Sequence, residues 1–414
     1  MTCPIRIDDD TVKGDSNMSA QRRIKVAVIF GGRSVEHDVS IVTGHQIMNA
    51  FPVEQYEIVP VYISRDGRWF TGDALAKLDS FKDDGVLRRD GVRACLLSPD
   101  TRHHGLIVDP LAGRLRKSEV KRIDVAFPAL HGTHGEDGSV QGLFELADIP
   151  YVGCATLGSA LTNDKVMTKQ VLRQAGIPVL DDHWVTRDQW LDDPDAVLDD
   201  LLKRFEFPLF IKPATLGSSI GIGRADSETL LRASIDIAAN FDRRILIEPA
   251  VTDGIEINCS VIGFGDGCEA STLEQPVSWD EFLSYEDKYL RGGEGMKSAE
   301  RLVPAPISPG FTARVKQTSI AAFKAVDGRG IARIDYLARP EANALYLNEI
   351  NTMPGSLAFY LWREDGYKSS DLVQKLVQLA RDAHAEKRRN IYDYETNLVD
   401  VASQRGIKGR KTVK

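Results

Sequence analysis

The segment IARIDYLARPEANALYLNEINTMPGS, residues 331–356, carries the pattern from which the fold and the chemistry of this chain are best inferred. Two apolar stretches, 331–338 and 344–351, flank a short turn, which predicts a β-hairpin. The sequence NTMPG follows, and its Gly355 is free to adopt a positive φ and to present its N–H to a ligand oxygen. A plain strand-ending turn is the alternative interpretation of this last motif.

The polar residues of the hairpin are spaced in twos. Side chains two positions apart on a strand share a face, which places Arg333 with Asp335 and Glu349 with Asn351. Two carboxylates on apolar strands are costly to bury unless a cation compensates them. Oxygen ligands suit Mg²⁺, so Asp335, Glu349 and Asn351 are candidate metal ligands, and Arg333 a candidate for neutralising a phosphate or oxyanion. The alternative is an exposed face with ordinary charges.

The segment KPATLGSSIGIG, residues 212–223, predicts a loop that contacts phosphate. Three glycines and two serines give a loop whose N–H groups approach an anion closely, and Lys212 ends the strand before it. The spacing matches neither the P-loop nor the dinucleotide fingerprint. A Gly/Ser loop beside a surface lysine remains the alternative.

The N-terminal part alternates buried strands with helices. Apolar runs at 24–32, 56–64 and 123–130 predict parallel strands, with a helix at about 40–51 between the first two. Such a doubly wound sheet binds ligands at the carboxyl ends of its strands, where Gly31–Glu36 and the loop HGTHGEDG (131–138) fall. His131, at a strand end, is either structural or next to a substrate.

Further elements follow along the chain. We expect helices at about 139–147, 164–174 and 369–388, strands at 207–214, from 245 and at 256–263, and a long loop at 272–303. The last helix carries an apolar stripe at helical spacing, formed by Leu372, Val373, Leu376, Val377 and Leu379.

Composition limits the class of protein. The chain has 414 residues, more than the ~250–300 at which single cores stop growing, so two or three lobes are expected. A formal charge of -8 argues against nucleic acid as the main partner. Five scattered cysteines without a CxxC pair predict reduced thiols in the cytoplasm. No apolar run approaches the ~18–20 residues that cross a bilayer, and the polar residues 1–23 do not resemble a secretory signal.

Seven segments, in order along the chain, resemble the motifs of the D-alanine–D-alanine ligase family, which has the ATP-grasp fold. They are FGGRSVEHDVS (30–40), PALHGTHGEDGSVQG (128–142), GSALTNDK (158–165), IKPATLGSSIGIG (211–223), EDKY (286–289), ARIDY (332–336) and NEINTMPGS (348–356). The resemblance implies an α/β, three-lobed architecture in which a doubly wound parallel-sheet lobe precedes two α+β lobes that clamp ATP. The divisions expected are a flexible arm (1–23), a substrate-binding lobe (24–150), a central lobe (151–240), a C-terminal lobe with the Mg²⁺ site and a lid loop (241–390) and a basic tail (391–414).

The resemblance also implies an activity. Members phosphorylate the carboxylate of one D-alanine with ATP, and the amino group of a second D-alanine then attacks the acyl phosphate to give D-alanyl-D-alanine for peptidoglycan. The implied cofactors are ATP and two Mg²⁺ ions, with Mn²⁺ as a substitute, and relatives are commonly homodimers. A cytoplasmic enzyme with small-molecule substrates is expected, without nucleic acid or membrane partners.

Roles carry over by position within the motifs. The ATP-binding residues implied are Lys165, Lys212, Gly217, Ser218, Ser219, Gly221, Glu248, Glu256 and Lys288. Asp335, Glu349 and Asn351 would hold the metal ions, while Arg333 and the N–H of Gly355 would stabilise the tetrahedral intermediate. Glu36 would bind the first ammonium and His131 would lie near its carboxylate; Ser218 and Tyr289 would form a hydrogen-bonded link with Glu36.

The acceptor site departs from the family pattern. Tyr289 favours an amine acceptor, because relatives that make depsipeptides tend to have phenylalanine there. After NTMPG, however, this chain reads SLAFYLW (356–362): Ser356 comes too early to match the usual acceptor-binding serine, and Tyr360 lies near its position. An ATP-grasp ligase with another acceptor, such as D-serine, is therefore one alternative. A nucleotide-binding protein that has lost catalysis is the other, although no residue of the implied catalytic set is missing.

Overall fold

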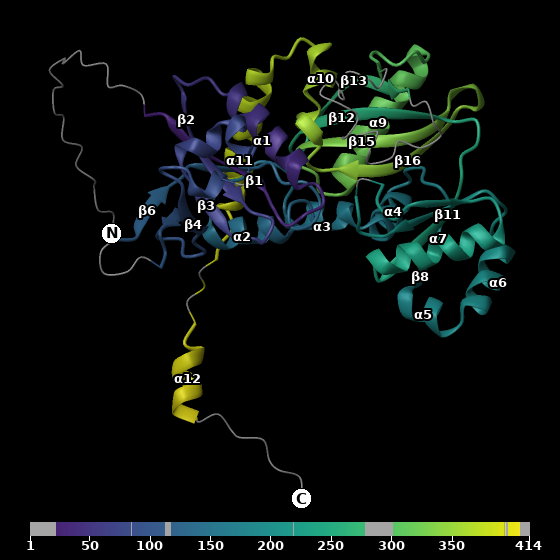
Figure 1. Ribbon diagram of the computed structural model, residues 1–414, viewed down its shortest axis with the longest axis horizontal. Coiled ribbons are helices and arrows are strands. Elements are labelled where there is room, and N and C mark those ends of the chain that lie inside the picture. The colour runs from purple at the N-terminus through teal and green to yellow at the C-terminus, as the bar shows by residue number, and fades with distance from the viewer. Residues whose placement is uncertain are drawn as a thin grey trace, which may run out of the picture.

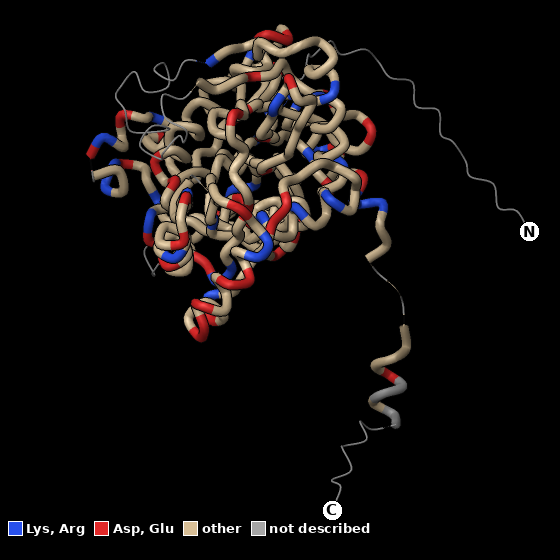
Figure 2. Tube along the Cα trace, turned by 90° about the vertical axis from the view of Figure 1, so that its right-hand side faces the viewer, with Lys and Arg blue, Asp and Glu red and all other residues tan. Residues whose placement is uncertain are grey.

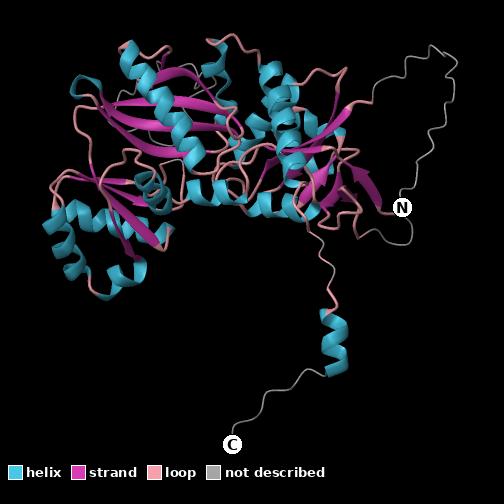
Figure 3. Cartoon of the chain, turned by 180° about the vertical axis from the view of Figure 1, so that it is seen from behind, coloured by secondary structure: helices cyan, strands magenta, loops and turns pink. Residues whose placement is uncertain are grey.

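The computed structural model describes residues 22–83, 85–111, 117–217, 219–277, 301–392, 394 and 396–405. Its three β-sheets follow one another along the chain: the first lies at the left of Figure 1, the second at the lower right and the third at the upper right. Seen from behind, helices pack against each of them (Figure 3). The expected α/β architecture is confirmed.

The first sheet has the order β6-β5-β4-β3-β2-β1-β7. Its strands are β1 (Ile24–Gly31), β2 (Tyr56–Ile63), β3 (Trp69–Thr71), β4 (Arg93–Leu97), β5 (Gly105–Val108), β6 (Glu119–Arg122) and β7 (Val125–Pro128). The prediction of parallel strands is right for β2, β1 and β7, but β3 to β6 extend the sheet with antiparallel pairs. The short connection 64–68 explains this difference, because a parallel pair needs a crossover of about a dozen residues. Three 3₁₀ turns lie between β3 and β4: η1 (Asp73–Ala76), η2 (Leu78–Phe81) and η3 (Val86–Arg88).

Helices cover both faces of the parallel part. Val26, Val28 and Phe30 pack with α1 (His37–Ala50) and with α11 (Ser369–Lys387), and the same cluster includes Ile262 and Ile331 of the third sheet. The opposite face, with Ala27 and Ile29, packs on α2 (Ser139–Ala147). The helix predicted near the C-terminus therefore joins the first sheet to the third. Its predicted apolar stripe is buried at Leu372, Val373, Leu376 and Val377.

The second sheet has the order β10-β9-β11-β8, and each neighbouring pair is antiparallel. Its strands are β8 (His183–Thr186), β9 (Leu209–Pro213), β10 (Gly223–Ala225) and β11 (Arg244–Pro249). Helices α3 (Thr156–Asn163) and α4 (Lys165–Gln174) lead into it, and α5 (Arg187–Asp192), α6 (Pro194–Arg204) and α7 (Glu228–Phe241) pack with it.

The third sheet has the order β14-β13-β12-β15-β16 and is antiparallel. Its strands are β12 (Ile255–Gly263), β13 (Glu269–Pro276), β14 (Arg301–Leu302), β15 (Gly330–Arg339) and β16 (Ala344–Asn351). Helix α9 (Pro309–Ala325) packs on one face through Phe311, Val315 and Phe323, which leaves the other face for polar groups. The short 3₁₀ turn η4 (Pro340–Ala342) closes the predicted hairpin of β15 and β16.

The prediction of a loop at 272–303 is wrong for its described ends. Residues up to Pro276 belong to β13, where Leu273 points into the core, and 301–302 form β14. The remaining part, 278–300, lies outside the described residues.

The last elements are η5 (Gly355–Ala358), α10 (Phe359–Arg363) and α12 (Leu398–Arg405), a helix within the expected tail that extends away from the body (Figure 1). In Figure 2, Lys and Arg alternate with Asp and Glu along the folded trace. Within the described ranges, we find no helix with the length and apolar character of a membrane span.

Candidate active site

The hairpin of β15 and β16 carries four polar side chains on one face of the third sheet. Arg333 is the register partner of Asn351, and Asp335 that of Glu349. The Arg333 guanidinium holds the Asp335 carboxylate through two bonds of 2.7 Å. Asn351 Nδ2 donates to Asp335 Oδ2 at 2.9 Å and to Glu349 Oε1 at 3.4 Å. The predicted hairpin and its shared polar face are confirmed, while the ligand roles of these residues stay predictions.

The charge of Arg333 is fixed by its surroundings. Burial alone would lower the pKa of Arg333, but the Asp335 carboxylate more than offsets this and holds the pKa well above its ordinary value. Arg333 is therefore a permanent cation and not a proton donor. The acidic and amide oxygens beside it form a donor set of the kind that Mg²⁺ takes in proteins, so the residues present fit that ion.

In the second sheet, Glu248 is almost fully buried and is held by two lysines. Lys169 Nζ lies 2.7 Å from Glu248 Oε2, and Lys212 Nζ binds Glu248 Oε1. Burial would raise the pKa of Glu248, but the two ammonium groups outweigh it and lower the pKa to about 2. Lys212 also donates to Asn348 Oδ1 of β16 at 3.1 Å, so this ion cluster is joined to the hairpin.

Lys165 begins α4, where the Asp164 side chain caps the helix. Its Nζ donates to the carbonyl oxygen of Leu216 at 2.7 Å, which ties the helix to the Gly-rich loop. Burial lowers the pKa of Lys165, and the nearby Glu349 carboxylate partly opposes this. Helix α4, the Gly-rich loop and the hairpin meet at a cavity of about 40 Å³. The cavity is lined in part by Glu136, Lys165, Gly217, Glu349 and Asn351.

Glu36 lies at the amino end of α1, buried beside the loop at 131–138. Gly132, with a φ of 68°, makes this approach feasible: a Cβ there would lie 2.4 Å from Glu36 Oε2. A Cβ at Gly217 would lie 3.7 Å from the same oxygen, so the Gly-rich loop also reaches Glu36. The two Gly-rich loops therefore meet at Glu36 in the fold.

His131 connects the first sheet to the NTMPG turn. Its Nδ1 lies 2.9 Å from the carbonyl oxygen of Met353, and its Nε2 lies 2.9 Å from Thr43 Oγ1. Since a carbonyl only accepts, Nδ1 carries the proton and Nε2 accepts from Thr43. Burial lowers the pKa of His131 and keeps the ring neutral. Both nitrogens are thus used in holding the turn, and the expected contact with a substrate carboxylate stays a prediction.

The NTMPG turn corrects one expectation. Positive φ falls not at Gly355 but at the three residues after it, Ser356, Leu357 and Ala358, with values of 51°, 51° and 49°. Leu357 and Ala358 are buried, and the N–H of Ser356 reaches Thr43 Oγ1 at 3.4 Å. Packing in this core over-determines the backbone, which offsets the cost of left-handed conformations in non-glycine residues.

Other predicted site residues are placed as follows. Ser219 and Gly221 have positive φ in the Gly-rich loop, and Glu256 is exposed at the start of β12. Tyr360 lies on α10 and donates from Oη to Glu274 Oε2 at 2.5 Å. Ser218, Lys288 and Tyr289 lie outside the described residues.

Sequence reasoning missed three residues of the site: Lys169, Glu136 and Asn348. Lys169 lies four positions after Lys165 on one helix, so helical spacing placed both on one face. Glu136 stands inside the quoted HGTHGEDG loop; its two oxygens accept from the N–H groups of Gly132 and Met353, each at 2.9 Å. No local signal pointed to Asn348, because its partner is 136 residues away.

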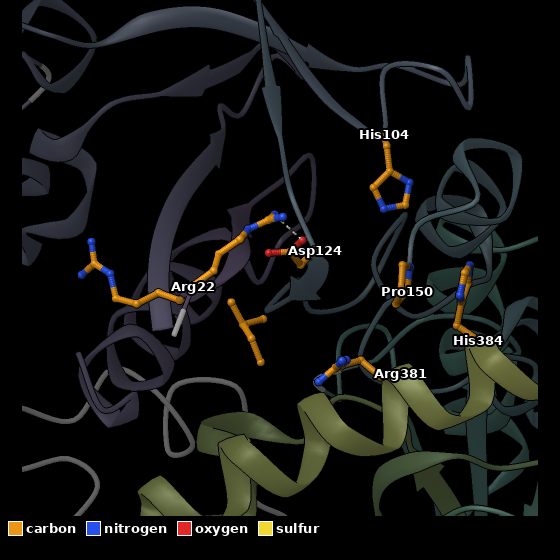
Figure 4. Close-up of a pocket in the computed structure, with 8 residues that line it drawn as sticks. Arg22, His104, Asp124, Pro150, Arg381 and His384 are labelled. Carbon is orange, nitrogen blue, oxygen red and sulfur yellow. Dashed lines mark hydrogen bonds and ion pairs between the residues drawn. The ribbon is translucent and has the colours of Figure 1, made fainter. Parts of the chain in front are cut away.

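A larger cavity, of about 350 Å³, lies at the amino end of β1 (Figure 4). Arg22 at its wall pairs with Asp124 at 2.9 Å, and His384 lies 2.9 Å from Asp148. Ligands of parallel sheets collect at the carboxyl ends of strands, where Gly31 and His131 lie. The candidate active site is therefore the meeting place of the hairpin and the Gly-rich loops and not this cavity.

Three sheets, a Gly-rich loop beside buried lysines and an acidic hairpin define an ATP-grasp ligase architecture. Family sequence profiles agree in both halves of the chain: "D-ala D-ala ligase N-terminus" matches residues 25–154 and "D-ala D-ala ligase C-terminus" matches residues 171–378. The D-alanine–D-alanine ligase of Acetivibrio thermocellus is 35% identical over 380 residues, which are 90% of this chain and 98% of that protein. The chain therefore belongs to the D-alanine–D-alanine ligase family, and it is a ligase.

Solved structures are similar as well. The VanG D-Ala:D-Ser ligase of Enterococcus faecalis superimposes with a TM-score of 0.74 at 28% identity, over 87% of this chain and 100% of that chain. The D-alanine–D-alanine ligase of Bacillus anthracis, crystallised with ATP, gives a TM-score of 0.63 at 24% identity over 88% and 99%. The second likeness bears on the fold alone. ATP is the nucleotide that this family uses.

Proposed function

We propose that this protein joins two D-alanine molecules into D-alanyl-D-alanine at the expense of ATP, through an acyl-phosphate intermediate. The observation that carries the proposal is the acidic hairpin face of Asp335 and Glu349, held beside Lys165 and the Gly-rich loop. A carboxylate is a poor electrophile, and phosphorylation gives it a good leaving group. Acidic and cationic side chains around one small cavity suit that transfer.

The nucleotide end of the site is assigned first. Lys165 and Lys212 neutralise phosphate oxygens, and the loop from Gly217 to Gly221 covers them with its N–H groups. Glu248, held by its two lysines, lies at the adenine pocket, and Glu256 lies near the ribose. Asp335, Glu349 and Asn351 hold Mg²⁺, which when bound supplies a Lewis acid for the phosphate oxygens. Lys288, which lies outside the described residues, approaches the transferring phosphate.

The substrate end surrounds Arg333. Glu36 binds the ammonium of the first D-alanine, and Ser218 and Tyr289 join it in a hydrogen-bonded link. His131 orients the first carboxylate by holding the NTMPG turn against α1. As the acceptor amine attacks, negative charge develops on the acyl oxygen, and Arg333 and the N–H of Gly355 stabilise it. Enclosure excludes water, which would hydrolyse the acyl phosphate.

The test is phosphate release by the purified protein with Mg²⁺ and ATP. We expect D-alanine to stimulate release strongly and L-alanine to do so far less, with D-alanyl-D-alanine identified by mass. Absence of D-alanine-stimulated release refutes the substrate assignment. Omitting Mg²⁺ from this assay tests the requirement for the metal. We also propose that the protein is a cytoplasmic homodimer, and light scattering during size-exclusion chromatography tests the dimer.

A second acceptor is the competing assignment. Tyr360 lies near the position where an acceptor-binding serine is usual, and a structurally similar protein is a D-Ala:D-Ser ligase. Supplying D-alanine together with D-serine or D-lactate, and identifying the products by mass, separates the two. A D-alanyl-D-serine product in excess of D-alanyl-D-alanine favours the second assignment.

A further inference from the structure

A row of polar residues crosses the third sheet beyond the hairpin. Glu274 of β13 is the register partner of Asn258, Asn258 that of Asp335, and Asp335 that of Glu349. Register partners on adjacent antiparallel strands share a face. The polar face of the hairpin therefore continues across β12 to Glu274 on β13, a residue outside the proposed catalytic set.

Glu274 is buried, with 1% of its surface exposed, and it is bound on both oxygens. Tyr360 Oη and Asn258 Nδ2 donate to Oε2 at 2.5 Å and 3.1 Å. Arg301 Nη1 lies 3.2 Å from Oε1. A buried carboxylate that is bound by three donors fixes each of its partners in position.

Arg301 is the partner that reaches outward. Its guanidinium carbon lies 4.6 Å from the centre of the Tyr360 ring, and its side chain is 36% exposed. The bond to Glu274 uses Nη1, whereas a guanidinium has donors on all three nitrogens in a fork that matches a carboxylate. Glu274 and Tyr360 thus fix the position of an arginine whose side chain stays partly exposed.

The helix that carries Tyr360 is anchored on the same face. Trp362 Nε1 donates to Ser260 Oγ at 3.0 Å, and Ser260 is the register partner of Arg333. Asp365 accepts from Thr272 on β13 at 2.6 Å. The position of Tyr360 relative to Arg333 is therefore set by contacts with β12 and β13.

We propose that Arg301, oriented by Glu274 and Tyr360, binds the carboxylate of the acceptor amino acid. This inference rests on the proposed function and specifies the acceptor half of that site. The acceptor needs its own cation, because the guanidinium of Arg333 is already bound by Asp335 through both Nε and Nη2. An amine that attacks beside Arg333 directs its carboxylate away from the acidic hairpin, toward β12 and β13. Arg301 takes the place of a serine hydroxyl with a charge-assisted bond, so acceptors with a free carboxylate are selected.

The experiment is a competition for the acyl phosphate between D-alanine and D-alaninamide, which lacks the carboxylate charge. Wild-type protein should favour D-alanine, and Arg301→Gln should reduce the product ratio about 10-fold or more. The variant should also raise the KM of the second D-alanine about 10- to 100-fold and leave the KM of ATP within about 2-fold. Arg301→Lys should recover part of the preference.

Arg232→Gln is the matched control. Arg232 also pairs with a carboxylate, that of Asp195, and lies over an aromatic ring, that of Trp190, but on the distant α7. We expect it to leave the product ratio unchanged. Tyr360→Phe keeps the ring and removes the bond to Glu274, so it should shift the ratio in the same direction as Arg301→Gln but less.

Two failures are distinguishable. Wild-type protein that releases no phosphate with D-alanine overturns the proposed function, and the assignment of Arg301 with it. Active wild-type protein whose Arg301→Gln variant keeps the product ratio overturns the assignment alone. An Arg301→Gln variant that weakens D-alanine, D-alaninamide and ATP equally has a merely structural defect and also overturns it.

Discussion

Two groups of acids in this molecule are compensated in different ways. Glu248 lies between the ammonium groups of Lys169 and Lys212, so its charge is matched before any ligand arrives. In the hairpin, Arg333 binds both carboxylate oxygens of Asp335. The neutral amide of Asn351 donates from Nδ2 to Glu349 Oε1 at 3.4 Å. The first group resembles a structural ion cluster, whereas the second is the group that we propose holds Mg²⁺. The difference predicts that one acid group determines stability and the other turnover.

Glu349→Gln has the largest expected effect on that comparison. Loss of one carboxylate from the proposed metal site should lower D-alanine-dependent phosphate release roughly a thousandfold, about 4 kcal/mol of activation free energy. The melting temperature should stay close to that of the wild type, because glutamine has nearly the same shape and volume as glutamate. Glu341→Gln, at an exposed position in η4, is the control. Near-normal turnover would refute the ligand role of Glu349.

Lys169→Met tests the other side of the comparison. It leaves the buried Glu248 with one ammonium group instead of two, and breaking a buried ion pair typically costs about 3 kcal/mol or more. Urea denaturation should show that loss in the free energy of unfolding, whereas the exposed Lys203→Met should change little. If Lys169→Met left the free energy of unfolding unchanged, the ion cluster of Glu248, Lys169 and Lys212 would not stabilise the fold.

Glu136 is an intermediate case with the smallest expected effect. It has backbone N–H donors instead of an ammonium partner, and burial, together with the charge of Glu36, raises its pKa from 4.5 to about 8. An unfolded chain releases this proton near pH 4.5 and the folded chain near 8, so the contribution of Glu136 to stability decreases as pH rises through that window.

Its test is the pH dependence of the free energy of unfolding between pH 5 and 8. Glu136→Gln should flatten the decline relative to wild type, while the exposed Glu54→Gln should keep it. An unchanged slope in Glu136→Gln would mean that Glu136 is ionised in the folded protein at neutral pH.

Much of the candidate site followed from short-range rules. The two-residue period of a strand placed Asp335, Glu349 and Asn351 on one face, and the structure has that register. The helical spacing of Leu372, Val373, Leu376 and Val377 predicted a buried stripe that the structure contains. These features depend on residues within a few positions of one another, for which periodicity is informative.

What the sequence did not reveal depends on contacts between distant segments. The carboxylate of Glu274 is bound by Tyr360, 86 residues later in the chain, and by Arg301, which follows the segment 278–300. The antiparallel strands within residues 65–122 are short and carry weak periodicity, so the sequence predicts short strands there but neither their bounds nor their pairing. The left-handed residues after Gly355 are likewise set by burial of Leu357 and Ala358, which glycine propensity does not report.

The packing of α11 has a consequence for how the chain is made. Val26 and Val28, near the beginning, share a core with Leu372 and Leu376, near the end. A nascent chain therefore leaves the part of its first sheet that α11 covers exposed until that helix has emerged from the ribosome. Chaperone dependence during synthesis, and aggregation of products truncated before Ser369, follow from this long-range closure.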